Sequence, residues 1–169
     1  MQIREEGLLF GEFDEANCFH IEKSDIYKRL SSKGFKSVEF VLHLPEQNEL
    51  LFVEGKTTLP AVNNLERFNK EIADISQKFM DSIHLTTGIW FGEHNAKAIV
   101  PHGKDSFFTF GMQIIFVLVV KNRKGRLNSI VERIRRELQR EHTLMRFKVL
   151  VLREEDAVKR NLVIGDVSA

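Results

Sequence analysis

The longest purely apolar run in this chain extends from Ile114 to Val120, inside a segment from Met112 whose residues favour β-structure. A continuous apolar run is typical of a strand that is covered on both faces, whereas a strand with one exposed face alternates apolar and polar residues. The run is far shorter than the roughly 20 residues that a membrane-spanning helix needs. We therefore predict a strand inside a sheet, with helices packed against that sheet.

The segments around this strand have either a helical or a strand period. Three segments with apolar residues at helical spacing are predicted to be helices. They are 25–33, between the N-cap candidate Ser24 and the stop residue Gly34; Leu65–Ile83, after a capping box of Asn63 and Glu66; and a helix that opens at Gly125, with apolar residues from Leu127 to Leu138. The apolar run Phe147–Leu152 predicts a last strand.

Two further β-rich runs, Val38–Leu44 and Glu49–Glu54, are separated by the polar residues 45–48. This pattern predicts a β-hairpin with a four-residue loop. In such a hairpin Leu44 faces Glu49. Each step back along the first strand is then matched by one step forward along the second strand.

Continued to the far end of the hairpin, this register places Glu39 opposite Glu54. Because side chains alternate between the two faces of a strand, Lys56 points to the same face as Glu54, and Gly55 does not. The sequence therefore predicts two carboxylates and one ammonium group at one end of two neighbouring strands.

The elements follow one another in the order α, β, β, α, β, α, β, which predicts an α/β protein. We expect a single three-layer domain over residues 1–169, with a central mixed β-sheet flanked by helices, because the length fits one domain and no repeat or linker interrupts it. Cys18 is the only cysteine, which excludes a disulfide framework and argues against a cysteine-based zinc site. The N-terminal MQIREEGLLF has acids where a signal peptide needs a basic leader, so we expect a cytoplasmic protein that does not bind a membrane.

Two acids opposite each other in apolar strands are destabilising and need a counter-charge. Lys56 supplies part of it, and a divalent cation supplies the rest. Mg²⁺ (or Mn²⁺) suits the position, because hard cations take carboxylate, water and phosphate oxygens as ligands. Such an ion lowers the pKa of a bound water, and a neighbouring lysine orients that water. The chemistry that this arrangement predicts is phosphodiester hydrolysis. The alternative is a salt-bridged polar patch without catalytic function.

The two segments Ser37–Val41 and Leu50–Thr58 resemble the core of the PD-(D/E)xK nuclease superfamily, whose fold is restriction-endonuclease-like. In that superfamily an acid on the second core strand and an acid-x-lysine triplet at the end of the third form the active site, and a helix that packs on the sheet follows. The resemblance extends over about residues 20–85. The first acid here is Glu39, where the superfamily more often has Asp preceded by Pro.

The resemblance implies a role for each residue of the hairpin site. Glu39 and Glu54 would bind the metal, Gly55 would offer its carbonyl oxygen as a further ligand, and Lys56 would position the attacking water. Glu39, Glu54 and Lys56 are thus the expected catalytic residues.

Members of the superfamily often add an acid from the helix before the sheet. Glu22 is the first candidate for this additional metal ligand, and Asp25 is the second. The helix after the triplet often contributes a polar residue as well. Gln77 and Lys78 are candidates for that position, although the same spacing also fits a solvent-exposed face.

The net charge of +1, from 25 basic and 24 acidic residues, conceals a basic region. Between Lys121 and Lys148 ten basic residues stand against three acids. Arg126, Arg133 and Arg140 recur every seven residues, with Arg136 beside them, which predicts a basic stripe on the helix. This stripe either contacts phosphates or is a solvent-exposed face without such a role. The residues expected to contact nucleic acid are Thr57, Thr58, Arg123, Lys124 and Arg126.

The sequence thus predicts a Mg²⁺-dependent endonuclease acting on DNA, as a homodimer or as the nuclease subunit of a larger restriction, defence or repair system. One alternative is a non-catalytic binding or scaffold protein with the same fold, which acts through protein partners. Another is an RNA-directed nuclease, because metal-assisted phosphodiester chemistry barely depends on the sugar.

Overall fold

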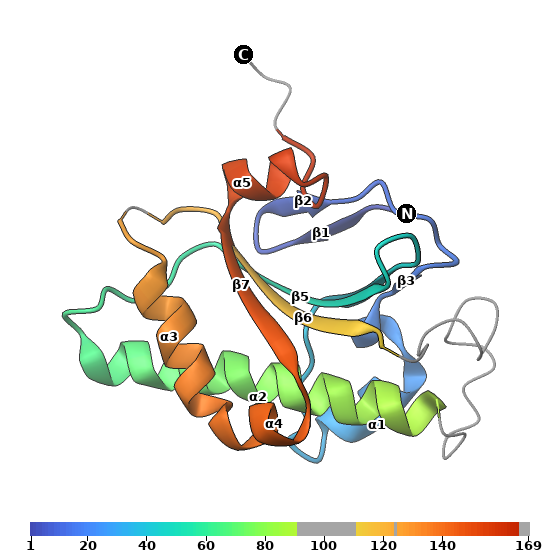
Figure 1. Cartoon of the computed structure of the whole chain (residues 1–169), viewed down its shortest axis with the longest axis horizontal. Helices are drawn as coiled ribbons and strands as arrows, with labels where there is room; N and C mark the ends of the chain where they lie inside the picture. Colours follow the sequence, from blue (N-terminus) through green and yellow to red (C-terminus); the bar gives the residue numbers. More distant parts are fainter. Residues whose placement is uncertain (91–110, 124, 166–169) are drawn as a thin grey trace.

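The computed structural model of the chain describes residues 1–90, 111–123 and 125–165. At its centre is a five-stranded mixed sheet in the order β3-β4-β5-β6-β7 (Figure 1). The strands are β3 (Cys18–Phe19), β4 (Phe40–Leu44), β5 (Glu49–Lys56), β6 (Gln113–Val120) and β7 (Phe147–Arg153). Strand β4 is antiparallel to β3 and β5, whereas β5, β6 and β7 are parallel to one another. The predicted mixed sheet is therefore confirmed, with the apolar run as the interior strand β6.

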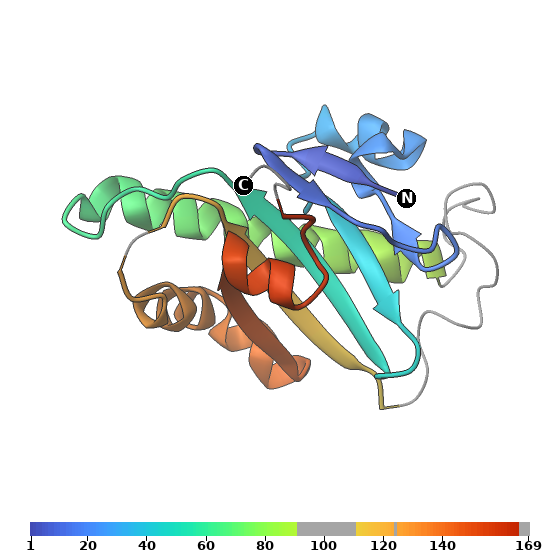
Figure 2. The ribbon, with the colours of Figure 1, turned by 90° about the horizontal axis from the view of Figure 1, so that it is seen from above.

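Helices cover one face of the sheet, and a small hairpin with a short helix covers the other (Figures 1 and 2). The first layer contains α1 (Asp25–Ser31), α2 (Leu65–Trp90), α3 (Asn128–Glu137) and α4 (Gln139–Leu144). The second contains the hairpin of β1 (Ile3–Glu5) and β2 (Leu8–Phe10), together with α5 (Glu154–Lys159). A 3-10 helix, η1 (Ile21–Lys23), precedes α1. The chain is thus the three-layer α/β domain that the sequence predicts.

The alternating side chains of the strands fill two hydrophobic cores. On the α2 face, the rings of Phe79 and Phe116 are stacked with their centroids 4.6 Å apart. On the opposite face, the rings of Phe10 and Phe40 meet edge to face at 5.2 Å. Because β5 contributes to both cores, its position is fixed from both sides.

The starts of α1 and α2 are as predicted, but the residue that caps α2 differs by one. The Ser24 hydroxyl accepts a hydrogen bond from the N–H of Tyr27 at 3.2 Å, so Ser24 is the N-cap of α1. At α2, Asn64 rather than Asn63 is the cap, and its Oδ1 accepts from the N–H of Arg67 at 3.3 Å. The turn in which the Asn64 N–H donates to the Ala61 carbonyl brings Asn64, not Asn63, to the helix entrance.

The predicted helix from Gly125 to Leu138 is wrong in its start and its continuity. Gly125 has φ +92° and lies outside the helix, which begins at Asn128. Leu138, buried in the core, leaves the helical conformation and separates α3 from α4. The stripe of Arg126, Arg133 and Arg140 is therefore wrong as a single helix face, because the three residues lie before α3, in α3 and in α4.

None of the helices in the described ranges is long and apolar enough to cross a membrane.

Candidate functional site

The β4–β5 hairpin has the predicted register over five pairs, from Leu44 opposite Glu49 to Phe40 opposite Val53. The ladder ends there, one pair earlier than predicted. Glu39 lies in a bend just before β4, and its N–H donates to the carbonyl of Val53 at 3.0 Å. Glu39 and Glu54 are therefore neighbours, but not a cross-strand pair.

The bend at Glu39 forms because helix α2 takes over the backbone hydrogen bonds of the preceding residues. The N–H of Lys36 donates to Asp81 Oδ2, and the N–H of Val38 donates to Ser82 Oγ, both at 2.9 Å. These N–H groups are then unavailable to a strand partner. Helix α2 thus fixes the segment that carries Glu39.

Glu54 is the most deeply buried acid of the site, with a side chain that is 0% exposed. Its Oε1 accepts from Lys78 Nζ at 2.7 Å, and Lys56 Nζ lies 3.6 Å from the same oxygen. Lys56 Nζ is also 3.1 Å from Glu71 Oε1 on α2. Glu54 Oε2 is buried and has no hydrogen-bond partner among the described residues. One of its two carboxylate oxygens is thus left without a donor.

A second group of acids adjoins Glu54. Glu5 at the end of β1, Glu22 in η1 and Glu39 each offer a carboxylate oxygen, and these oxygens lie within 4.8 Å of one another. Three oxygens at this spacing from three separate elements can ligate one divalent cation. We call Glu5, Glu22 and Glu39 the acidic cluster.

The electrostatics of the site show a shortage of positive charge. Burial, together with the neighbouring carboxyl groups of Glu54 and Glu22, raises the pKa of Glu39 from 4.5 to about 8. Burial raises the pKa of Glu54 to about 7, although Lys78 and Lys56 lower it. Burial also raises the pKa of Glu22, against the opposing charge of Lys78. The carboxyl groups of Glu39 and Glu54 therefore hold protons near neutral pH unless a further cation replaces them.

The pKa values of the two lysines are also raised, which for a lysine favours the charged form. Burial by itself lowers the pKa of Lys78, but its ion pair with Glu54 outweighs burial and raises the pKa above 10.5. Burial likewise lowers the pKa of Lys56, and Glu54 together with Glu71 raises it above 10.5 overall. Both lysines are therefore charged at neutral pH.

The structure brings together Glu22, Glu39, Glu54 and Lys56 of the predicted site. Gly55 points to the opposite face, as predicted, where a Cβ would lie 3.2 Å from the Phe10 ring. This close contact explains a glycine at the middle of the triplet. Asp25, the second candidate for the upstream acid, is exposed and lies 3.5 Å from Lys28.

The predicted nucleic-acid contacts lie around the carboxyl end of β5 or beyond it. The Thr57 hydroxyl donates to the Glu6 carbonyl at 2.6 Å, and Thr58 lines a cavity beside it. Arg123 Nη1 lies 3.5 and 3.4 Å from the carbonyls of Leu59 and Pro60. Arg126 is exposed, and Lys124 lies outside the described residues.

Sequence reasoning did not assign Glu5 and Glu71, and it left Lys78 open. Of the two helix candidates, Lys78 contacts Glu54, whereas Gln77 donates to Asp81 Oδ1 at 2.6 Å. Glu71 and Lys78 are seven residues apart beside the apolar stripe of α2. This spacing places both on one side of the helix next to its buried face, and it could have indicated that they point toward the site. Glu5 carries no such signal, because β1 and β2 have only three residues each.

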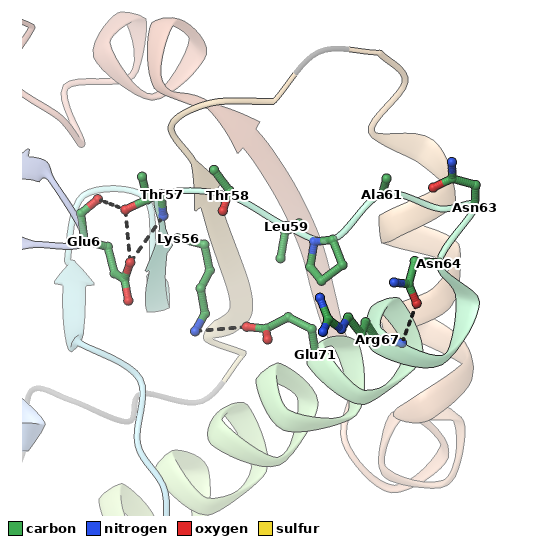
Figure 3. A pocket seen from close by; sticks show the side chains of 11 residues that line it. Glu6, Lys56, Thr57, Thr58, Leu59, Ala61, Asn63, Asn64, Arg67 and Glu71 are labelled. Atoms are coloured by element: carbon green, nitrogen blue, oxygen red, sulfur yellow. Dashed lines mark hydrogen bonds and ion pairs between the residues drawn. The ribbon is translucent and has the colours of Figure 1, made fainter.

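A cavity of about 590 Å³ opens next to Lys56, between the loop after β5, the first turns of α2 and the β1–β2 turn (Figure 3).

Comparison of the chain with protein-family models, with curated proteins and with solved structures finds no match. The site offers buried carboxylates that can hold a hard cation, two ammonium groups beside them, and an adjacent polar cavity.

Proposed function

We propose that this protein is a metal-dependent phosphodiesterase that cuts nucleic acid internally, with DNA as its expected substrate. One observation carries the proposal: buried Glu39 of the acidic cluster and buried Glu54 beside it lie with two lysines at the end of a strand pair. The acid-x-lysine triplet, the hairpin and the long helix that packs on the sheet agree with what the resemblance to PD-(D/E)xK nucleases implies.

The charge balance supports a divalent cation at this site. The whole site contains five carboxyl groups and two ammonium groups, namely those of Glu5, Glu22, Glu39, Glu54 and Glu71 and those of Lys56 and Lys78. Burying unbalanced carboxylates is costly, and a divalent cation would reduce that cost. The donors are all oxygens, which favours Mg²⁺ or Mn²⁺ over softer metals.

In this proposal Glu22, Glu39 and Glu5 hold the metal together with the unpartnered Oε2 of Glu54. When bound, the ion supplies a water of lowered pKa and stabilises the charge that develops on the phosphate. The ammonium group of Lys56 orients the attacking water, and Glu71 holds that ammonium group in place. Lys78 keeps the Glu54 carboxylate charged and oriented.

The proposal is tested by incubating the purified protein with Mg²⁺ or Mn²⁺ and with plasmid, linear, single-stranded and branched DNA, and with RNA. We expect metal-dependent cleavage that EDTA abolishes. Glu54→Gln and Lys56→Ala should each reduce cleavage by about a hundredfold or more, because each removes a group that acts on the reacting atoms.

Matched controls are Glu49→Gln at the other end of β5 and Lys70→Ala on the exposed side of α2. Both should cleave as the unmodified protein does. If all substrates remain intact and calorimetry detects no metal binding, the proposal is wrong, and a non-catalytic scaffold becomes the better account. That alternative predicts that Glu39, Glu54 and Lys56 substitutions leave biological activity unchanged.

A further inference from the structure

The cavity beside Lys56 has a mainly polar lining (Figure 3). Among its lining residues Leu59, Pro60 and Ala61 are apolar, and Leu59 is buried in the core. The remaining lining groups are carboxyl, hydroxyl, amide, ammonium and guanidinium groups. A cavity of this composition is suited to a charged or strongly polar ligand rather than to an apolar one.

The two acids in the lining already have partners. The carboxylate Oε2 of Glu6 accepts a hydrogen bond from the backbone N–H of Thr57 at 3.4 Å, and Glu71 is paired with Lys56 at 3.1 Å. Their charges are therefore partly compensated within the protein. The two acids therefore do not prevent a negatively charged ligand from binding at the opposite wall of the cavity, which Thr58, Asn63 and Arg67 form.

The donors of that opposite wall are uncommitted. The side chains of Thr58, Asn63 and Arg67 line the cavity, and none of them is bonded to another of the residues that the structure describes. The Arg67 side chain extends from α2 in the direction of Glu71 and Lys56 (Figure 3). A guanidinium group presents a fork of N–H donors that matches the geometry of a phosphate.

The cavity adjoins the acidic site at Lys56. Lys56 belongs to both, since its ammonium group lies 3.6 Å from Glu54 while its side chain lines the cavity. Glu6 lines the cavity and directly follows Glu5 of the acidic cluster. A strand whose reacting phosphate lies at the acidic cluster would therefore pass its neighbouring nucleotide into this cavity.

We propose that this cavity binds a backbone phosphate of the substrate strand, next to the phosphodiester bond that is cut, and that Arg67 is the principal contact. The inference rests on the proposed function and names the position at which the substrate is held. Asn63 and Thr58 add neutral hydrogen bonds to the same phosphate. Arg67 is a binding residue in this account, and it does not touch the reacting atoms.

The test measures binding of a fluorescent 20-nucleotide oligonucleotide in Ca²⁺, with and without a 5′-phosphate, over a series of salt concentrations. Arg67→Ala should weaken binding by about tenfold or more, because a charged hydrogen-bonded contact is lost. The slope of log Kd against log salt should fall by about 0.7 to 0.9, as expected for one phosphate contact. Arg67→Lys should bind with intermediate affinity, because it keeps the charge without the fork.

Arg29→Ala on α1 is the matched control, since Arg29 is exposed and does not line the cavity. It should change neither the affinity nor the salt slope. If Arg67→Ala weakens binding only when a 5′-phosphate is present, the cavity takes a terminal phosphate and the proposal of a backbone phosphate is overturned.

Failure of this inference can be distinguished from failure of the proposed function. If the unmodified protein cleaves nucleic acid with Mg²⁺, and Arg67→Ala leaves Kd and salt slope unchanged, the cavity assignment is wrong and the function stands. If the unmodified protein cleaves no substrate but binding depends on Arg67, the phosphate contact stands and the catalytic proposal fails. Absence of any oligonucleotide binding overturns both.

Discussion

Glu39 is a carboxyl group that folding removes from water, with an exposed fraction of 4%, next to other carboxyl groups. Its pKa is about 8 in the folded chain and close to 4.5 when the chain is unfolded and the group is solvated. The folded protein thus binds this proton more tightly than the unfolded chain. By linkage, the free energy of unfolding must then decrease as pH rises from about 4.5 to about 8.

We predict that the metal-free protein loses stability between pH 5 and pH 8, and that Glu39→Gln loses less, because the amide has no proton to release. Urea unfolding at several pH values in EDTA measures this difference. Glu46→Gln, an exposed change in the β4–β5 loop, should keep the dependence of the unmodified protein. Identical pH dependence in Glu39→Gln and the unmodified protein would show that Glu39 does not titrate as described.

At the scale of elements, helix α2 connects the site to the fold. Asp81 and Ser82 hold the backbone before Glu39, and Glu71 and Lys78 hold the charged groups of β5. The contacts extend over three turns of one helix, so displacement of α2 would affect all of these groups together. The position of Glu39 is therefore set by α2 as much as by its own strand.

Ser82→Ala should destabilise the protein by about 1–3 kcal/mol, because it leaves the buried N–H of Val38 without its acceptor. Ser76→Ala provides a matched control in the same helix. Ser76 is also buried, but its hydroxyl has no partner among the described residues, so its removal should cost little or nothing. Chemical denaturation of the two variants compares them directly, and an equal loss of stability in both would contradict the role assigned to Ser82.

Elements with strong local signals were predictable from the sequence. The hairpin register followed from a four-residue loop, since loop length fixes which residues pair. The break at Leu138 was not predictable, because the apolar spacing continues through it. The cap of α2 is Asn64 and not Asn63 because the turn that begins at Ala61 places Asn64 at the helix entrance. Both candidates are asparagines, so the residue type alone could not distinguish them.

The site was predictable only where a strand pattern carried it. Glu54 and Lys56 follow from the period of β5, and they were placed correctly on one face. Glu5 joins the acidic cluster because the β1–β2 hairpin packs on the face of the sheet away from α2 and brings the end of β1 to Glu22 and Glu39. This is a long-range arrangement, which no local sequence pattern indicates.

At the scale of the whole molecule, the site exists only where all three layers meet. The β1–β2 hairpin contributes Glu5, the sheet contributes Glu54 and Lys56, and helix α2 contributes Glu71 and Lys78 (Figure 1). The net charge of +1 is then an average over a negative centre and a basic region in the second half of the chain. Binding of nucleic acid by this chain alone should accordingly be weak and sensitive to salt.

The central claim is that the acidic cluster and Glu54 hold a divalent cation, and anomalous diffraction from crystals soaked in Mn²⁺ above pH 8 tests it most directly. The account predicts an anomalous peak within about 2.3 Å of carboxylate oxygens of Glu22 and Glu39, as is usual for a hard cation. The Glu39→Gln variant under the same conditions should lose that peak or much of its occupancy. Crystals at millimolar Mn²⁺ with no anomalous peak at these carboxylates, while Lys78 remains on Glu54, would contradict the account.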